Sequence, residues 1–75
     1  MISSQIAMYV LRPDAEGDEV ELEVAVGYEA DAYGTRVDDF GETVEGGMII
    51  KLTPGEIERA TDRAWREWGE ERHAS

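Results

Sequence analysis

The sequence predicts an α+β fold, in which a small antiparallel sheet of three to four strands carries one C-terminal helix on one face. Three observations predict it. Apolar residues alternate with polar ones in the first half of the chain, a glycine pair marks a turn at residues 46–47, and a helix-start signal occupies residues 53–56. Helices that follow a set of strands pack on one face of the sheet, so we expect residues 1–75 to form a single domain.

The first two strands are expected at about residues 5–11 and 20–29, as an antiparallel hairpin. The second run is the clearer one, because large apolar residues of even number alternate with acidic or small residues of odd number. A turn-forming segment with proline and glycine, residues 12–18, separates the two runs. The first run is apolar on both parities, with Ile6, Met8 and Val10 on one face and Ala7, Tyr9 and Leu11 on the other.

Two short strands are expected at about residues 42–45 and 48–52, on either side of the turn at Gly46-Gly47. In the second of them the alternation directs Met48, Ile50 and Leu52 toward the core and leaves Ile49 and Lys51 on the opposite side. Residues 31–41 break every period, so we expect a surface connection there.

The helix is expected at about residues 54–70, with fraying over residues 71–75. Thr53 is the expected N-cap, Pro54 the first helical residue and Glu56 the third, which together predict a capping box. At about 100° per residue, one stripe of side chains faces the sheet, with Trp65 at its flank. This stripe consists of Ile57, Ala60, Thr61, Ala64 and Trp68.

The segment that leads into the helix resembles that of small phage-encoded accessory proteins with a strand–strand–strand–helix pattern. The residues that carry the resemblance are 49–58, which follow the glycine turn, and the acidic alternating strand that ends in Tyr28. The resemblance covers about two-thirds of the chain. It implies a phage or prophage accessory protein, and it assigns no site residue.

The charge is strongly acidic, and most of it precedes residue 50. Eighteen Asp and Glu residues face seven Lys and Arg residues, for a net charge of −11. This charge repels phosphate backbones and anionic lipid headgroups, so we expect neither direct nucleic acid binding nor membrane binding. It predicts instead a protein partner with a basic surface.

The first residues show no signal peptide, and no apolar run approaches the roughly 20 residues of a membrane span. The chain has no cysteine, which fits a reducing compartment. We therefore expect a cytoplasmic protein, within a bacterial host if the chain is phage-encoded.

No catalytic, cofactor or metal site is predicted. The chain lacks a cysteine nucleophile, and its only histidine, His73, lies in the expected frayed tail, so no nucleophile and base can be paired. The acidic segment that begins at Asp14 invites comparison with a calcium loop. That loop needs glycine at its sixth position and glutamate at its twelfth, where this chain has Glu19 and Ala25.

Six residues are candidates for binding a partner. Tyr9, Leu11 and Ile49 are expected on the sheet face opposite the helix, where their apolar area needs cover. The other three are the strand carboxylates Glu21 and Glu23, and Trp65 at the helix flank, a residue type enriched in interfaces.

Two functions fit these observations. The first is a non-enzymatic interaction module that binds a protein, or a second copy of itself, through the sheet face. The alternative is an inhibitor that imitates nucleic acid and fills the basic groove of a host nucleic-acid-binding protein, of the anti-restriction or anti-CRISPR type.

Overall fold

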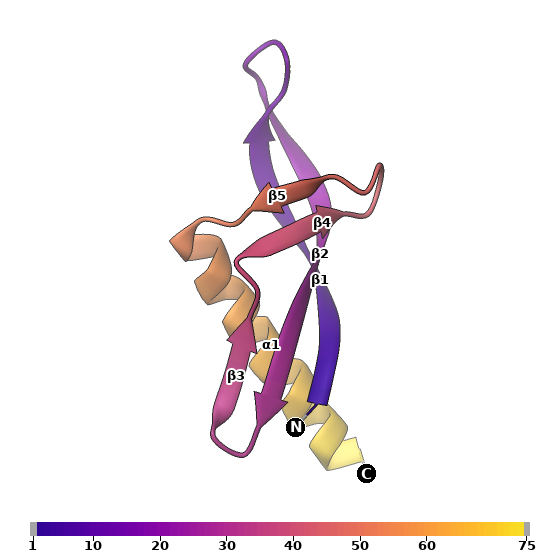
Figure 1. The fold of residues 1–75 in the computed structure, drawn as a ribbon, viewed down its shortest axis with the longest axis vertical. Coiled ribbons are helices and arrows are strands. Elements are labelled where there is room, and N and C mark those ends of the chain that lie inside the picture. Colours follow the sequence, from indigo (N-terminus) through magenta and orange to yellow (C-terminus); the bar gives the residue numbers. More distant parts are fainter. Residues whose placement is uncertain (1, 75) are drawn as a thin grey trace.

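The structure is a computed structural model that describes the backbone of residues 2–74 and the side chains of residues 2–69. Its elements are β1 (Ile2–Pro13), β2 (Glu19–Asp31), β3 (Gly34–Val37), β4 (Phe40–Thr43), β5 (Ile49–Lys51) and α1 (Pro54–Ala74). The strands form one five-stranded antiparallel sheet, and α1 packs against β1, β2 and β3 (Figure 1). The predicted α+β fold is therefore confirmed, with one strand more than expected.

β1 and β2 form a long hairpin that extends beyond the predicted bounds at both ends. Their register is continuous from the pair Ile2–Ala30 to the pair Pro13–Glu19, without a bulge. The turn that joins them is held by Asp14, whose carboxylate accepts hydrogen bonds from the N–H groups of Glu16 and Asp18 at 2.9 and 3.0 Å. This tip projects beyond the rest of the molecule, and β1 begins near the opposite end, beside the end of α1 (Figure 1).

The prediction that residues 31–41 form a connection was wrong, because they contain β3 and the first residues of β4. β3 pairs with the end of β2, from Tyr28–Val37 to Asp31–Gly34, across a two-residue loop. The Asp31 carboxylate accepts a hydrogen bond from the N–H of Tyr33 at 2.8 Å. Strands of four residues carry too little alternation to be recognised, and Val37 is the one large buried side chain of β3.

The fourth strand begins and ends earlier than predicted, at residues 40–43 in place of 42–45. Val44 and Glu45 belong to the turn, in which Gly46 and Gly47 have positive φ values of 90° and 63°. The N–H of Met48 donates to the Thr43 hydroxyl at 2.8 Å, which closes the turn at this residue. Met48 therefore lies outside the core that was predicted for it and is exposed.

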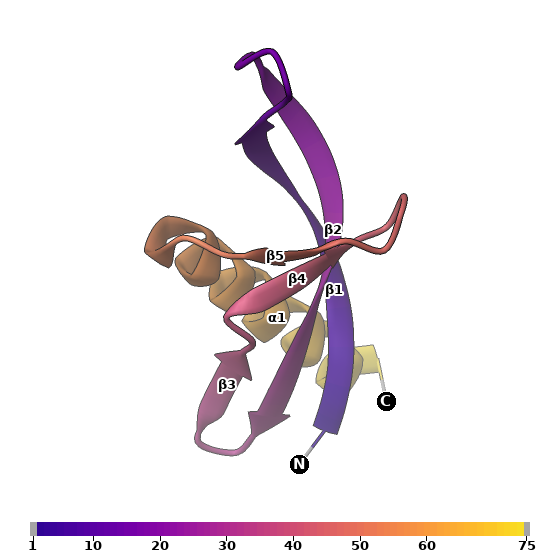
Figure 2. The same cartoon turned by 45° about the horizontal axis from the view of Figure 1, so that its top comes forward.

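The strand order is β1-β2-β4-β5, and β3 pairs with a separate part of β2. β4 meets β2 only at the pairs Val24–Thr43 and Ala25–Glu42, and it crosses the twisted β1–β2 ribbon together with β5 (Figure 2). The helix α1 covers one face of the sheet that these strands form. We call the opposite face the outer face.

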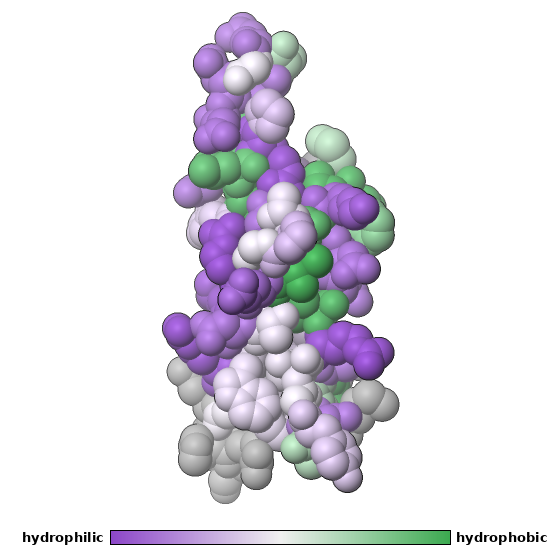
Figure 3. Space-filling model, turned by 90° about the vertical axis from the view of Figure 1, so that its left-hand side faces the viewer, coloured by the Kyte–Doolittle hydropathy of each residue, from purple (hydrophilic) through white to green (hydrophobic). Residues whose placement is uncertain are grey.

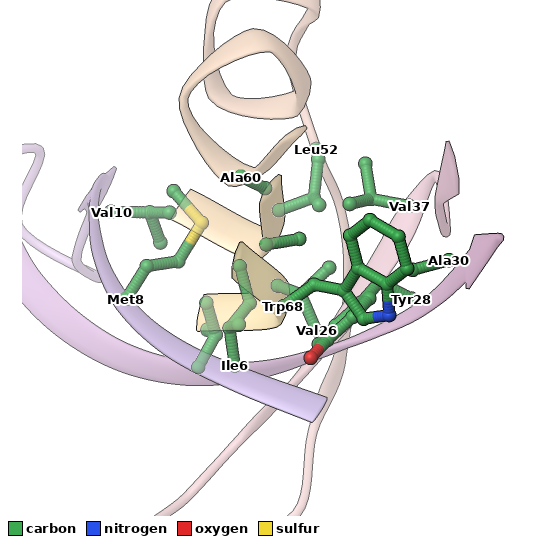
Figure 4. Close-up of a cluster of buried hydrophobic side chains, with 12 residues drawn as sticks. Ile6, Met8, Val10, Val26, Tyr28, Ala30, Val37, Leu52, Ala60 and Trp68 are labelled. Atoms are coloured by element: carbon green, nitrogen blue, oxygen red, sulfur yellow. The ribbon is translucent and has the colours of Figure 1, made fainter. Parts of the chain in front are cut away.

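The core lies between α1 and the even-numbered residues of β1 and β2 (Figure 4). Ala60 and Ala64 are fully buried, as expected for a helix that approaches its sheet closely. Leu52 is buried and Ile50 is half-buried, in agreement with the predicted alternation. The remaining buried hydrophobic residues are Ile6, Met8, Val10, Val24, Val26, Tyr28, Ala30, Val37 and Trp68.

α1 begins where the sequence predicts and continues beyond the predicted end at residue 70, as far as Ala74. Glu56 donates its N–H to the Thr53 hydroxyl at 3.2 Å, and the Glu56 carboxylate accepts from the N–H of Thr53 at 2.8 Å. This reciprocal pair is the predicted capping box. Helix backbone at residues 71–74 replaces the fraying expected there, while Ser75 lies outside the described residues.

Candidate functional site

The outer face is formed by the odd-numbered residues of β1 and β2. Four of the predicted binding residues lie side by side on it, because the register places Tyr9 opposite Glu23 and Leu11 opposite Glu21. Tyr9 and Leu11 are each 55% exposed. Directly opposed residues lie within about 5.5 Å at Cβ, so an apolar row and an acidic row run side by side.

The acidic row follows β2 but is interrupted at Ala25 and Gly27, which carry no polar side chain. Neighbouring segments fill both gaps. β4 places Glu42 opposite Ala25, and a Cβ atom built on Gly27 would lie only 2.6 Å from Oδ2 of Asp38, which therefore covers this glycine. We call the resulting row of carboxylates the acidic ridge; its members are Glu21, Glu23, Glu42, Asp38 and Glu29.

All five carboxylates of the acidic ridge are exposed, and within the described residues none of them forms an ion pair. The basic residues nearest to it in the sheet register are Arg36, opposite Glu29, and Lys51, opposite Phe40. Both lie toward the ends or edges of the row. The middle of the outer face therefore presents negative charge without local compensation.

Exposed apolar side chains flank the acidic ridge on both sides. Tyr9 and Leu11 lie on the β1 side, and Phe40 and Ile49, which are 52% and 63% exposed, lie on the β4–β5 side. Phe40 and Ile49 line a shallow hollow of about 350 Å³ together with Ala25. A side view of the molecule shows hydrophobic surface exposed among hydrophilic residues below the hairpin tip (Figure 3).

Trp65 does not join this surface, because it belongs to α1 on the opposite side of the sheet. Its ring centroid lies 5.6 Å from that of Trp68, with the two planes inclined by 40°. Trp68 is buried and Trp65 is 49% exposed, which agrees with the predicted flank position. Five of the six candidate residues therefore share the outer face, and Trp65 lies apart from them.

Four residues of this surface are not among the six candidates, namely Glu29, Asp38, Phe40 and Glu42. Asp38 and Phe40 fell in the segment expected to be irregular, and Glu42 was placed in a strand without a role. One signal was present, because Ala25 and Gly27 are the only small residues in an otherwise acidic series on β2. Small residues in a strand often mark the close approach of another segment.

The strongest electrostatic interaction lies away from the outer face, between β1 and the first turn of α1. Arg12 donates from both terminal nitrogens to the carboxylate of Glu56, at 2.6 Å each. These hydrogen bonds, together with that from the Thr53 N–H, lower the pKa of Glu56 to about 2 despite its burial. They also raise the pKa of Arg12. Both side chains are engaged in this ion pair, so we assign it a structural role.

The described residues contain no group of three or more His, Asp or Glu side chains arranged to hold a metal ion. The described part of the chain contains no helix that is both long enough and apolar enough to cross a membrane. The chain matches no family model, no curated protein and no solved structure. The resemblance to phage accessory proteins therefore stays a prediction, and the surface itself is the basis for assigning a function.

Proposed function

We propose that this protein is a non-enzymatic binding module whose outer face binds a basic surface on a partner protein. The observation that carries the proposal is the acidic ridge, a continuous row of exposed carboxylates assembled from β2, β4 and the segment between β3 and β4. Such a row attracts a cationic partner and orients it during the encounter.

The apolar flanks supply the second component of binding. Carboxylates alone contribute mainly to association rate and specificity, whereas affinity needs apolar area removed from water. Tyr9 and Leu11 on one side and Phe40 and Ile49 on the other provide that area within reach of the ridge. A partner surface that fits would combine a line of Lys or Arg residues with apolar residues on both sides.

The charge also decides between a foreign partner and a second copy on this face. Two copies stacked face to face would bring their ridges within about 10 Å of each other, the usual spacing of packed sheets. Like charges that oppose each other in a partly dry interface cost free energy. A basic protein therefore fits the outer face better than a copy of the same chain.

Imitation of nucleic acid is the second candidate, and the regular single row of charge favours it. The ridge spans eight residue steps of β2, which is about 27 Å at about 3.3 Å per residue. Its five carboxylates are thus spaced about 7 Å apart, whereas one DNA strand carries a phosphate every 3.4 Å or so along the axis. The ridge has about half of that density, so recognition of a basic protein surface in general is the better supported function.

Capture of partners from a bacterial lysate, compared between two variants of equal net charge, tests the proposal. The ridge variant is Glu21→Gln with Glu23→Gln, and the control is Glu16→Gln with Glu58→Gln, which are exposed positions outside the ridge. We expect a basic protein that is retained at low salt, released at high salt and lost only with the ridge variant. Equal retention by both variants would contradict the proposal.

Competition with duplex DNA separates the two candidates. A nucleic-acid-mimicking inhibitor must lose its partner when DNA is added in excess, because both ligands occupy one groove. A module that binds a basic surface elsewhere on its partner keeps it. If the chain is the phage accessory protein that its sequence resembles, that partner is a host protein of the bacterial cytoplasm.

A further inference from the structure

The outer edge of β1 is a long strand edge that pairs with no other described strand. β1 has twelve residues and pairs with β2 alone. Proteins usually protect such edges with lysine, proline, a bulge or a covering segment. Residues 2–11 contain no charged residue and no proline, although one-third of the whole chain is charged, and their register with β2 has no bulge.

Two hydrogen bonds on the far side of β2 show which residues of β1 direct their backbone groups outward. The carbonyl groups of Glu23 and Gly27 accept from the N–H groups of Val44 and Asp38, at 3.0 and 2.9 Å. Odd-numbered residues of β2 therefore direct their polar backbone groups away from β1. Residues opposite each other in an antiparallel pair share this pattern, so the odd-numbered residues of β1 direct theirs outward. These residues are Ser3, Gln5, Ala7, Tyr9 and Leu11.

We propose that a second copy of this chain pairs its β1 with this edge, antiparallel and across a two-fold axis at Ala7. Residues whose backbone groups point outward must pair with residues of the same kind on the second copy. A two-fold axis at Ala7 satisfies this condition for all five. The pairs are Ala7 with Ala7 of the second copy, Gln5 with Tyr9, and Ser3 with Leu11. Each such pair exchanges two hydrogen bonds, but the Leu11 carbonyl already accepts from a terminal nitrogen of Arg12 at 2.7 Å, so about eight would form.

Charge is compatible with this occupant, although each copy carries a net charge of −11. The edge itself is uncharged over residues 2–11. The acidic ridge lies mainly on β2, so two ridges would be separated by three strand spacings, which is about 14 Å. That distance exceeds the Debye length of about 8 Å at physiological ionic strength, so their repulsion is largely screened.

Space beside the edge is also present. A hollow of about 580 Å³ lies along β1 and the first turn of α1, lined in part by Tyr9, Leu11, Gly55 and Arg59. An added strand would leave the outer face of both copies open, so the dimer is compatible with the proposed function and does not depend on it. Strand pairing buries less area than a standard interface of about 1,600 Å². We therefore expect a dimer that dissociates on dilution.

Cysteine cross-linking tests the two-fold axis directly, because the chain has no cysteine of its own. In the proposed dimer, Ala7→Cys places the two thiols opposite each other, with Cα atoms about 5.5 Å apart, which a disulfide tolerates. The control is Ser3→Cys, exposed on the same strand and face, whose two copies would lie about 27 Å apart. We expect Ala7→Cys to form a covalent dimer at least tenfold faster under mild oxidation. Equal rates would overturn the proposed register.

Sedimentation equilibrium over a wide range of concentration tests the dimer itself. The unmodified chain is expected to approach twice its mass of 8.4 kDa as concentration rises. Ala7→Pro removes an outward N–H and no hydrogen bond to β2, so it should stay folded by circular dichroism and remain monomeric. The ridge variant Glu21→Gln with Glu23→Gln should dimerise as the unmodified chain does, whatever the fate of its partner binding. A constant monomer mass for the unmodified chain would overturn the proposal, and loss of a captured partner from Ala7→Pro would then assign the edge to a strand of another protein.

Discussion

Arg12 holds Glu56 in a two-pronged ion pair that joins the end of β1 to the first turn of α1. Each terminal nitrogen of the guanidinium donates to a different carboxylate oxygen, at 2.6 Å, between residues 44 positions apart in the chain. One of these nitrogens also donates to the carbonyl of Lys51 at 2.8 Å, so β5 is bound to the same point. Arg12 thus fixes the helix start relative to two strands.

The first prediction concerns the dependence of stability on pH. The pKa of Glu56 is about 2 in the folded chain, below its ordinary value of 4.5, so its contribution is complete above about pH 4.5 and is lost as the pH falls toward 2. The loss by pH 2 should be about 3 kcal/mol, because the two pKa values differ by about 2.5 and each pKa unit corresponds to about 1.4 kcal/mol. Urea unfolding of the chain and of Glu56→Gln should show a difference in stability that shrinks across this interval. A difference that is constant from pH 5 to pH 2 would contradict the role of the ion pair.

The second prediction concerns the helix cap. Thr53→Ala removes the hydroxyl that accepts the N–H of Glu56, and it should cost about 0.5–2 kcal/mol. The cost is a sizeable part of the 5–15 kcal/mol or so that domains have in total. Thr53→Ser keeps the hydroxyl and serves as the matched control. An unchanged urea midpoint for Thr53→Ala would show that the cap does not stabilise the helix start.

The features that the sequence predicts well depend on residues close together in the chain. The capping box joins positions three apart, and the alternation of β2 is visible over ten consecutive residues, so both are confirmed. β3 was not predicted, because its four residues form a strand only through their pairing with β2. A long element can be recognised from its own sequence pattern, whereas a short strand is determined mainly by the strand with which it pairs.

The acidic ridge and the Arg12–Glu56 pair illustrate the other limit. Glu42 and Asp38 complete the ridge only because β4 and the segment before it lie beside Ala25 and Gly27. The sequence predicts Arg12 as part of a turn. In the structure β1 continues through Arg12, and the Arg12 side chain contacts the start of the helix. Such contacts between distant segments depend on the order of the strands in the sheet, and the alternation of apolar and polar residues does not specify that order.

The third prediction concerns Gly27, whose missing side chain makes room for Asp38. Gly27→Ala would place a methyl group 2.6 Å from Oδ2 of Asp38, so the carboxylate must turn away. Because the end of a flexible side chain moves, stability should change by about 0.5 kcal/mol or less. Affinity for a basic ligand should fall about twofold, since one exposed charge contact contributes about 0.2–1 kcal/mol.

Gly69→Ala is the matched control for this substitution. Within the described part of the chain, and apart from the neighbouring helix backbone, no atom lies within 4 Å of the added methyl group. The change replaces a glycine within α1. It should stabilise the chain by about 0.5–1 kcal/mol and leave ligand affinity unchanged. Urea unfolding and ligand titration on both variants check these outcomes. If Gly27→Ala binds as tightly as Gly69→Ala, Asp38 contributes nothing to the ridge.

The central claim is that the position of the carboxylates, and not net charge alone, determines binding of a basic partner. Titration calorimetry with an oligolysine peptide at low salt measures this directly. Neutralising Glu21 and Glu23 should weaken binding about fivefold, since two exposed contacts of about 0.5 kcal/mol each sum to about 1 kcal/mol. The equally charged control, Glu16→Gln with Glu58→Gln, should bind nearly as the unmodified chain does. Equal weakening in both variants would contradict the account and leave the acidic ridge as a solubilising surface.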